Sequence, residues 1–330
     1  MALEVHAYDI VCFAIVAAAL VGATWIIRSK EAPDKSPDET LLETILTPET
    51  HGSHTGVTPV GYIGTHEVWE SCWRGVHPLW LLATRAVSAV VMVFFLVWDI
   101  EDWSLTIFVY YTEWTFTLVI FYFVLGTIVS AHACWEYFKK GSVSNDERTT
   151  FLRRDIEENM GHGSNGMEGN IKLQGNHEQK ETKQRARFLG YTMQIVYQTC
   201  AGAVVLTDVV FWLVIVPFLN DDRFSLNLLM GSMHSLNAVF LLLDTALNNM
   251  RFPFFRMAYF VLWSCIYVIF QWVIHACGVS WWPYPFLELS TPWAPLWYFC
   301  LALVHIPCYG IYALIVKLKY YFLHAGVSSN

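Results

Sequence analysis

Seven apolar runs, each long enough to cross a lipid bilayer as a helix, constrain this chain more than any other feature. They cover residues 8–27, 78–98, 105–131, 188–219, 226–247, 254–275 and 294–316. A spanning helix needs about 20 mostly apolar residues, because a helix satisfies its own backbone hydrogen bonds in hydrocarbon. Only 15% of the 330 residues are charged, whereas soluble domains carry about 25%. The sequence therefore predicts an all-α, polytopic membrane protein.

Polar stretches divide the chain into four parts. We expect an N-terminal transmembrane helix over 1–28, a polar cytoplasmic loop over 29–77, a six-helix transmembrane domain over 78–320 and a C-terminal tail over 321–330. Within the third part, the composition of residues 140–186 is too polar to bury a core, so a mobile cytoplasmic loop is expected there. The first run follows an acidic segment, which favours an uncleaved helix over a signal peptide.

Basic residues predict the orientation of the chain. Lys and Arg gather after the third, fifth and seventh runs, whereas the alternate connections are acidic or neutral. Because basic loops stay in the cytosol, the N-terminus is expected outside the cell or in a lumen, and the C-terminus in the cytoplasm. The membrane is that of the endoplasmic reticulum or the plasma membrane.

Composition also narrows the partners. A net charge of −8 disfavours nucleic acid, which needs a basic face. The eight cysteines include no CxxC pair, so neither a metal nor another cofactor is expected. The expected partner is membrane lipid, including a lipid ester as substrate. The sequence identifies no protein partner.

Polar side chains inside the apolar runs mark the candidate site. An ionisable residue at the centre of a span costs about 2.5–3.5 kcal/mol, so each one invites a functional reason. At about 1.5 Å per residue, Thr112, Asp208 and His234 fall in one layer, roughly 10–14 Å from the outer helix ends. A hydroxyl and a neutral imidazole in hydrogen-bond reach can act as nucleophile and general base. The alternatives are polar contacts between helices and a path for a transported ligand.

Other polar residues receive supporting roles. Thr115 lies on the same helical face as Thr112 and is an alternative nucleophile. Asp208 would orient His234 from the next helix. The full supporting set is Glu113, Thr115, Asp208, Ser235, Asn237, Asp244 and His275.

The remaining members of this set have distinct expected tasks. Glu113 would tune proton demand or substrate choice beside the nucleophile, and Ser235 or Asn237 would donate to an oxyanion. His275 would bind a carboxylate head group or lie in the hydrated interface between membrane and water. Asp244 lies about 15 Å deeper than His234 by helical rise, and we expect it to pair with Arg251 or Arg256.

Within residues 78–320, several characteristic residues and motifs follow one another in a recognisable order. SMHSLNAVFLLLDTALNN is followed by RFPFFRMAYFVLWSCIYVIFQWVIHACGVSWWPYPFLE. The characteristic residues and motifs are His234, the acid ten residues later at Asp244, His275 and WPYPFLE at 282–288. In these features the chain resembles the family of androgen-induced and androgen-dependent TFPI-regulating membrane proteins, together with rolling stone-like and uncharacterised plant membrane proteins.

That resemblance implies an activity. Members of the family hydrolyse fatty acid esters of hydroxy fatty acids with a membrane-embedded threonine and histidine. Here the nucleophile would be Thr112 in YYTEWTF and the base His234, in a threonine-dependent hydrolase that acts on lipid esters within the bilayer. The alternative is a non-enzymatic multi-pass membrane protein that serves as a scaffold, fusion factor or carrier.

The stretch SWWPYPFLELSTPW at 280–293 is too rich in proline for a helix. We expect an interfacial loop over the mouth of the bundle. It would serve either as a lid that admits lipid or as an anchor at the head groups.

Overall fold

The computed structural model describes residues 7–31, 66–73, 75–159, 188–218 and 228–328. Seven helices in these ranges are long and apolar enough to cross a membrane, which confirms the all-α, multi-pass architecture. The protein is therefore an integral membrane protein. Its spanning helices are α1 (Ala7–Glu31), α3 (Pro78–Trp103), α4 (Tyr111–Asn159), α6 (Phe188–Val210), α8 (Leu228–Leu247), α9 (Met257–Ala276) and α10 (Ala294–Ser328).

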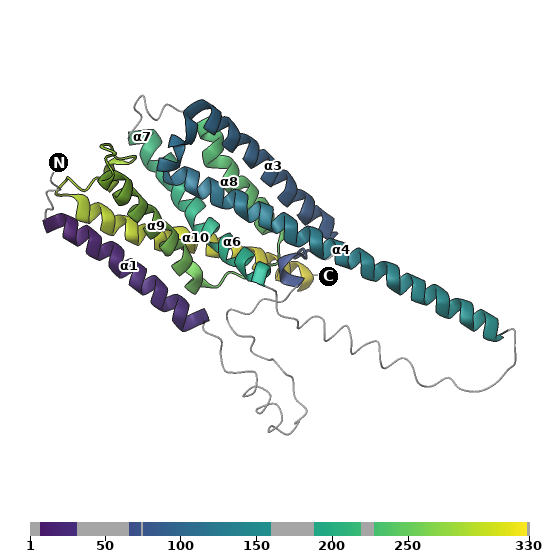
Figure 1. The fold of residues 1–330 in the computed structure, drawn as a ribbon. Coiled ribbons are helices and arrows are strands. Elements are labelled where there is room, and N and C mark those ends of the chain that lie inside the picture. Colours follow the sequence, from purple (N-terminus) through teal and green to yellow (C-terminus); the bar gives the residue numbers. More distant parts are fainter. Residues whose placement is uncertain (1–6, 32–65, 74, 160–187, 219–227, 329–330) are drawn as a thin grey trace, which may run out of the picture.

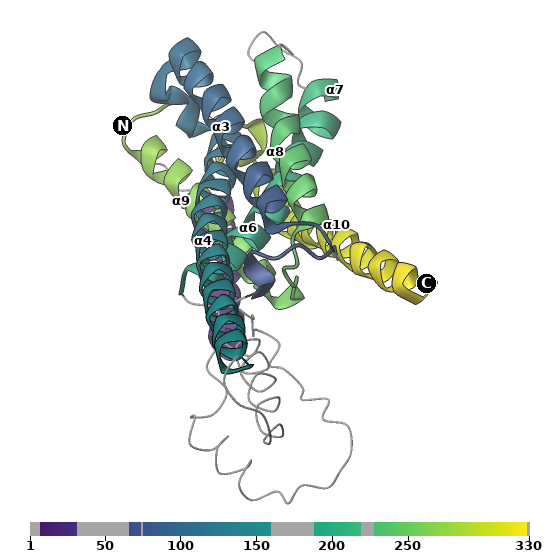
Figure 2. The same ribbon diagram turned by 90° about the vertical axis from the view of Figure 1, so that its right-hand side faces the viewer.

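Helix α6 is the centre of the bundle (Figure 1). It contacts α4 and α8 on one side and α9 and α10 on the other. Helix α3 packs on α4 and α8, whereas α1 packs on α9 and α10. Two three-helix groups, α3–α4–α8 and α1–α9–α10, therefore flank α6. Figure 2 shows α4 and α10 extending away from this bundle in different directions.

The start of α4 differs from the predicted helix start at residue 105. A short 3-10 helix, η2 (Ser104–Val109), comes first, and α4 begins at Tyr111. Ser104 has a positive φ of 62°, and Tyr110 is extended, so the chain changes direction twice here. Consequently Thr112 lies in the first turn of α4 rather than well inside a helix.

Helices α4 and α10 continue beyond their predicted ends. Helix α4 runs through residue 159, into the predicted loop 140–186, and α10 runs through residue 328, where a tail was expected. Apolar composition marks the membrane-spanning part of a helix, whereas polar residues of good helix propensity can continue the helix beyond the membrane. Residues 111–159 contain no proline. The rest of the predicted loop, 160–186, lies outside the described residues.

Part of the predicted polar loop 29–77 packs against the bundle. Residues 66–73 begin with the 3-10 helix η1 (His66–Val68), and the Val68 side chain is buried. The indole Nε1 of Trp73 donates to the carbonyl of Ala246 at 2.8 Å. This donor satisfies one of the last carbonyls of α8, which have no partner inside the helix. These residues of the connection between α1 and α3 thus cap the end of α8.

Arg85 and Asp244 form a fully buried ion pair. Arg85 Nε lies 2.8 Å from Asp244 Oδ1, and both side chains are 0% exposed. Arg85 Nη1 also donates to Ser130 Oγ at 2.6 Å and to the Val68 carbonyl at 3.1 Å. The second carboxylate oxygen accepts from the Tyr122 hydroxyl. The network joins α3, α4 and α8, and we call this end of the bundle the ion-pair end.

The predicted partners of Asp244 were wrong. Arg251 instead pairs with Glu67 at 3.0 Å, and Arg256 pairs with Glu31 at 2.6 Å. Asp244 is paired with an arginine inside an apolar run, because an unpaired charge buried between helices is very costly.

We predict that Arg85→Ala lowers the free energy of unfolding by about 3–5 kcal/mol, because it leaves a buried carboxylate without its partner. The double variant Arg85→Ala/Asp244→Ala should lose less than Arg85→Ala alone. Unfolding of the purified protein in detergent measures both. Arg251→Ala is the control, since its half-exposed ion pair should contribute at most about 1 kcal/mol. A double variant that simply adds the two single losses would contradict the coupling.

Gly202 brings α6 and α9 into close approach. A Cβ at this position would lie 2.4 Å from Phe260 Cδ1, so Gly202→Ala should destabilise the protein by about 1–3 kcal/mol. Gly310→Ala in α10 is the matched control, because its Cβ would meet no atom within 4 Å. That change should be neutral or stabilising, since alanine favours helix. Equal thermal unfolding of the two variants would show that the predicted contact does not matter.

Candidate functional site

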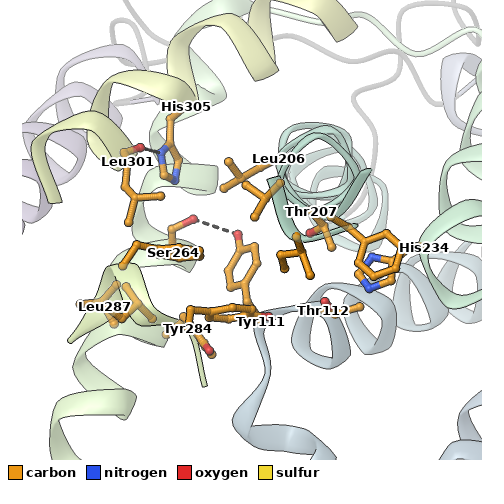
Figure 3. A pocket seen from close by; sticks show the side chains of 16 residues that line it. Tyr111, Thr112, Leu206, Thr207, His234, Ser264, Tyr284, Leu287, Leu301 and His305 are labelled. Carbon is orange, nitrogen blue, oxygen red and sulfur yellow. Dashed lines mark hydrogen bonds between the residues drawn. The ribbon is translucent and has the colours of Figure 1, made fainter. Parts of the chain in front are cut away.

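A cavity of about 90 Å³ lies between the two helix groups (Figure 3). It is lined by Tyr111 and Thr112 at the start of α4, whereas the ion-pair network contacts Tyr122 and Ser130 farther along this helix, so the two lie at opposite ends. We call the end of the bundle that holds the cavity the cavity end. Helices α4, α6, α8, α9 and α10, the π-helix η3 (Phe211–Ile215) and the loop before α10 all contribute to its walls. Most of the wall is apolar. The polar groups on it are Tyr111, Thr112, Thr207, His234, Ser264, Tyr267, Tyr284 and His305.

Thr112 is presented by the N-terminus of α4. Just before this helix, the carbonyl of Val109 accepts from Gln271 Nε2 at 2.6 Å and from the Tyr267 hydroxyl at 2.8 Å. Both donors belong to α9, so α9 fixes the position at which α4 starts. The N–H groups in the first turn of a helix lack partners within the helix and carry partial positive charge. Thr112 therefore lies beside groups that stabilise negative charge.

The loop before α10 closes one side of the cavity. It contains one 3-10 turn, η6 (Pro285–Leu287), and no α-helix, as its prolines predicted. Burial raises the pKa of Tyr284, and hydrogen-bonding groups of Thr112 and Tyr111 oppose the rise. The Tyr284 hydroxyl thus lies at the start of α4, against Thr112. Tyr284, Phe286 and Leu287 of this loop line the cavity, and its expected role as a lid or an anchor stays a prediction.

His234 is held by an aromatic stack. Its ring lies on that of Phe211 with the ring centroids 3.5 Å apart and the planes 7° apart. Phe211 opens η3, a single π-helical turn of the kind that frequently occurs at functional sites. Nδ1 of His234 is buried and has no hydrogen-bond partner among the described residues. The stack therefore sets the plane of the imidazole, and no hydrogen bond in the described chain occupies this nitrogen.

The structure places the two residues predicted as nucleophile and base on one cavity. Thr112 and His234 are both buried and both line it, and Figure 3 shows them on the same side. They come from helices α4 and α8, more than a hundred residues apart in sequence. Thr115, the alternative nucleophile, is fully buried and outside the cavity lining, where it accepts from Thr207 Oγ1 at 3.4 Å.

The other supporting residues lie outside the lining. Asp208 and Asn237 are within interaction range of each other. Asp208 Oδ1 and His234 Nδ1 are both buried without a hydrogen-bond partner among the described residues, so the orienting role of Asp208 stays a prediction. Asn237 Oδ1 accepts from the backbone of Ala238 at 2.7 Å. Ser235 is half-buried.

Three further predicted residues occupy separate places. Glu113 is buried on the side of α4 where Asp99 of α3 is its charged neighbour. Asp244 belongs to the ion-pair end. His275, at the end of α9, stacks on Trp282 with the ring centroids 4.2 Å apart. None of the three lines the cavity.

Several lining groups were not predicted to belong to the site. The hydroxyls of Tyr111 and Ser264 lie 2.9 Å apart across the cavity wall. Thr207 and His305 face the same space from α6 and α10 (Figure 3). The available signal was a polar residue within an apolar run, as for Thr112. One sequence does not show which face of each helix meets the cavity.

The described residues contain no cluster of three or more His, Cys, Asp or Glu side chains suited to a metal ion. Comparison with protein-family models, curated proteins and solved structures finds no match for this chain. Fold and site thus define a seven-span, all-α membrane protein with a small, largely apolar cavity at one end.

Proposed function

We propose that this protein is a threonine-dependent hydrolase of lipid esters within the membrane. The observation that carries the proposal is the shared cavity of Thr112 and His234 at the N-terminus of α4. A hydroxyl, an imidazole and fixed donors for an oxyanion are the components of acyl transfer. The sequence resemblance to the androgen-induced and androgen-dependent TFPI-regulating proteins supports the same two residues.

In the acylation step, Thr112 Oγ1 attacks the ester carbonyl carbon while His234 accepts the hydroxyl proton. The N–H groups in the first turn of α4 and the Tyr284 hydroxyl stabilise the tetrahedral oxyanion. The bond from the carbonyl carbon to the alcohol oxygen then breaks, and the leaving alcohol takes the proton from His234. The acyl group remains as an ester on Thr112.

In the deacylation step, water attacks the acyl-threonine and gives a proton to His234. The bond to Thr112 Oγ1 breaks, and that oxygen regains the proton. A free fatty acid leaves, so the net reaction consumes one water and yields one acid and one alcohol. The same imidazole serves as base and then as acid in each step.

The surroundings of the cavity suit a substrate that arrives from lipid. Trp281 and Trp293, in the covering loop and at its end, are 41% and 68% exposed. Exposed tryptophans collect at the level of the head groups, where lipid ester groups also lie. From the distribution of basic loops we further propose that the cavity faces the lumen or cell exterior and the C-terminus faces the cytoplasm. The host membrane would be the endoplasmic reticulum or the plasma membrane.

We predict that Thr112→Ala and His234→Ala each abolish labelling by a fluorophosphonate probe and lower ester hydrolysis at least about 10³-fold. Thr112→Ser should retain part of both, because it keeps a hydroxyl. Thr106→Ala is the matched control, since Thr106 is exposed on η2 and lies outside the cavity lining. Gel fluorescence of the purified, folded proteins measures labelling.

Absence of labelling in the folded wild-type protein, with no ester hydrolysis, would contradict the proposal. It would favour the non-enzymatic class of scaffold, fusion factor or carrier. In that class Thr112→Ala and Thr112→Ser should behave alike.

A further inference from the structure

A second histidine faces the cavity from the wall opposite His234. His305 is on α10, its side chain is 8% exposed, and its ring lies against Phe260 with the centroids 4.5 Å apart. Figure 3 shows it across the cavity from Thr112 and His234. The acyl-transfer steps derived above do not use it.

The hydrogen bonds of His305 fix which of its nitrogens carries a proton. Nδ1 lies 2.6 Å from the carbonyl oxygen of Leu301. A carbonyl only accepts, so Nδ1 must donate. In the neutral ring the other nitrogen, Nε2, then holds a lone pair. That nitrogen is buried and has no hydrogen-bond partner in the described part of the chain, and in Figure 3 it points toward the cavity.

The charge of the lining indicates what His305 can bind. The described residues that line the cavity include two histidines but no aspartate, glutamate, lysine or arginine. A cationic imidazole would therefore be buried without a counter-ion, which is costly. The neutral ring offers an acceptor, and an acceptor in an apolar site selects a group that donates a hydrogen bond without carrying charge. A hydroxyl is such a group, whereas a carboxylate is not.

The size of the cavity limits how far this hydroxyl lies from the ester. The cavity volume of about 90 Å³ suits a short polar segment of a lipid rather than a whole acyl chain. An ester group, a hydroxyl and the two or three carbons that join them fill this space. The long acyl chain must extend beyond it.

We propose that His305 is a substrate-binding residue whose Nε2 accepts a hydrogen bond from a free hydroxyl two or three carbons from the ester oxygen. The substrate class is therefore a neutral, hydroxyl-bearing ester such as a partial glyceride or a glycol ester. The catalytic part of this inference rests on the proposed function, whereas the binding part is independent of it. With its hydroxyl on His305, such a substrate spans the cavity and brings its carbonyl to Thr112.

Binding of an ether that cannot be hydrolysed tests the site without any turnover. The probes are a monoalkyl glycerol ether and its counterpart with both hydroxyls methylated. Tryptophan fluorescence of the full-length protein in detergent measures the dissociation constants. Wild type should bind the ether with free hydroxyls ~10-fold more tightly than the methylated ether, a difference that corresponds to about one neutral hydrogen bond. His305→Phe should remove this preference, because it keeps an aromatic ring beside Phe260 but has no acceptor.

Two other variants separate this effect from a disturbed helix. Ile306→Phe adds a ring at the next position of α10, where the side chain is 49% exposed and outside the cavity lining, and should keep the full preference. His305→Gln retains an acceptor oxygen and should keep part of it. If His305→Phe does not fold, the binding of the two ethers to wild type and to His305→Gln still tests whether His305 accepts the hydrogen bond. Equal binding of the two ethers to wild type would overturn the inference.

A matched pair of esters extends the test to catalysis. Glycol monoester and its methoxy counterpart should differ ~10-fold or more in kcat/KM with wild type, and His305→Phe should slow only the hydroxyl ester. An equal slowing of both esters would overturn the inference and assign His305 to the hydrolytic water. Tighter His305-dependent binding of a carboxylate-bearing ether than of the hydroxyl ether would also overturn it.

The two proposals can fail separately. Fluorophosphonate labelling at Thr112 without any hydroxyl preference would leave the hydrolase and remove the role of His305. A His305-dependent preference among the ethers without labelling would leave a lipid-binding site in a protein that is not a hydrolase.

Discussion

The buried Arg85–Asp244 pair is the interaction on which the arrangement of the site depends. Both side chains are fully enclosed, and neither charge has a low-energy alternative in hydrocarbon. The pair therefore fixes the rotation of α8 about its own axis relative to α3 and α4. At about 100° per residue, His234 lies roughly 80° around α8 from Asp244. Asp244 thus faces α3 and α4 while His234 faces η3 and the cavity.

The second helix group is coupled to the site through one aromatic ring. Phe260 of α9 packs against Gly202 of α6, where a Cβ would have no room. The same ring lies against His305. The tight contact between α6 and α9 therefore also sets the position of the imidazole on α10. Further along α6, η3 begins and presents Phe211 to His234. Each cavity histidine thus rests on a phenylalanine that the packing of α6 positions.

The spanning helices could be predicted because hydropathy reports directly on the surrounding lipid. The side-chain contacts between helices could not be predicted, since they depend on how each helix is rotated about its axis. Asp244 shows this limit: its sequence neighbours Arg251 and Arg256 were plausible partners, but Arg85 from an apolar run forms the pair. Thr112 shows another, because a 3-10 turn moved the helix start and placed this residue in the first turn of α4. Nor did any local pattern mark the π-helix beneath His234 or the tautomer of His305.

The cavity has a largely apolar lining with few polar groups, and that composition limits its chemistry. Its lining offers hydroxyls and imidazoles but no carboxylate, ammonium or guanidinium group within the described residues. The positive electrostatic potential in the cavity comes instead from the N-terminus of α4. Supplying it in this way does not require a charged side chain to be buried away from water. Such a site gives little stabilisation to an ionic ligand that must leave water. In the proposed reaction it would stabilise negative charge only where that charge develops, beside Thr112. A neutral ester that reaches the site from the bilayer meets both conditions.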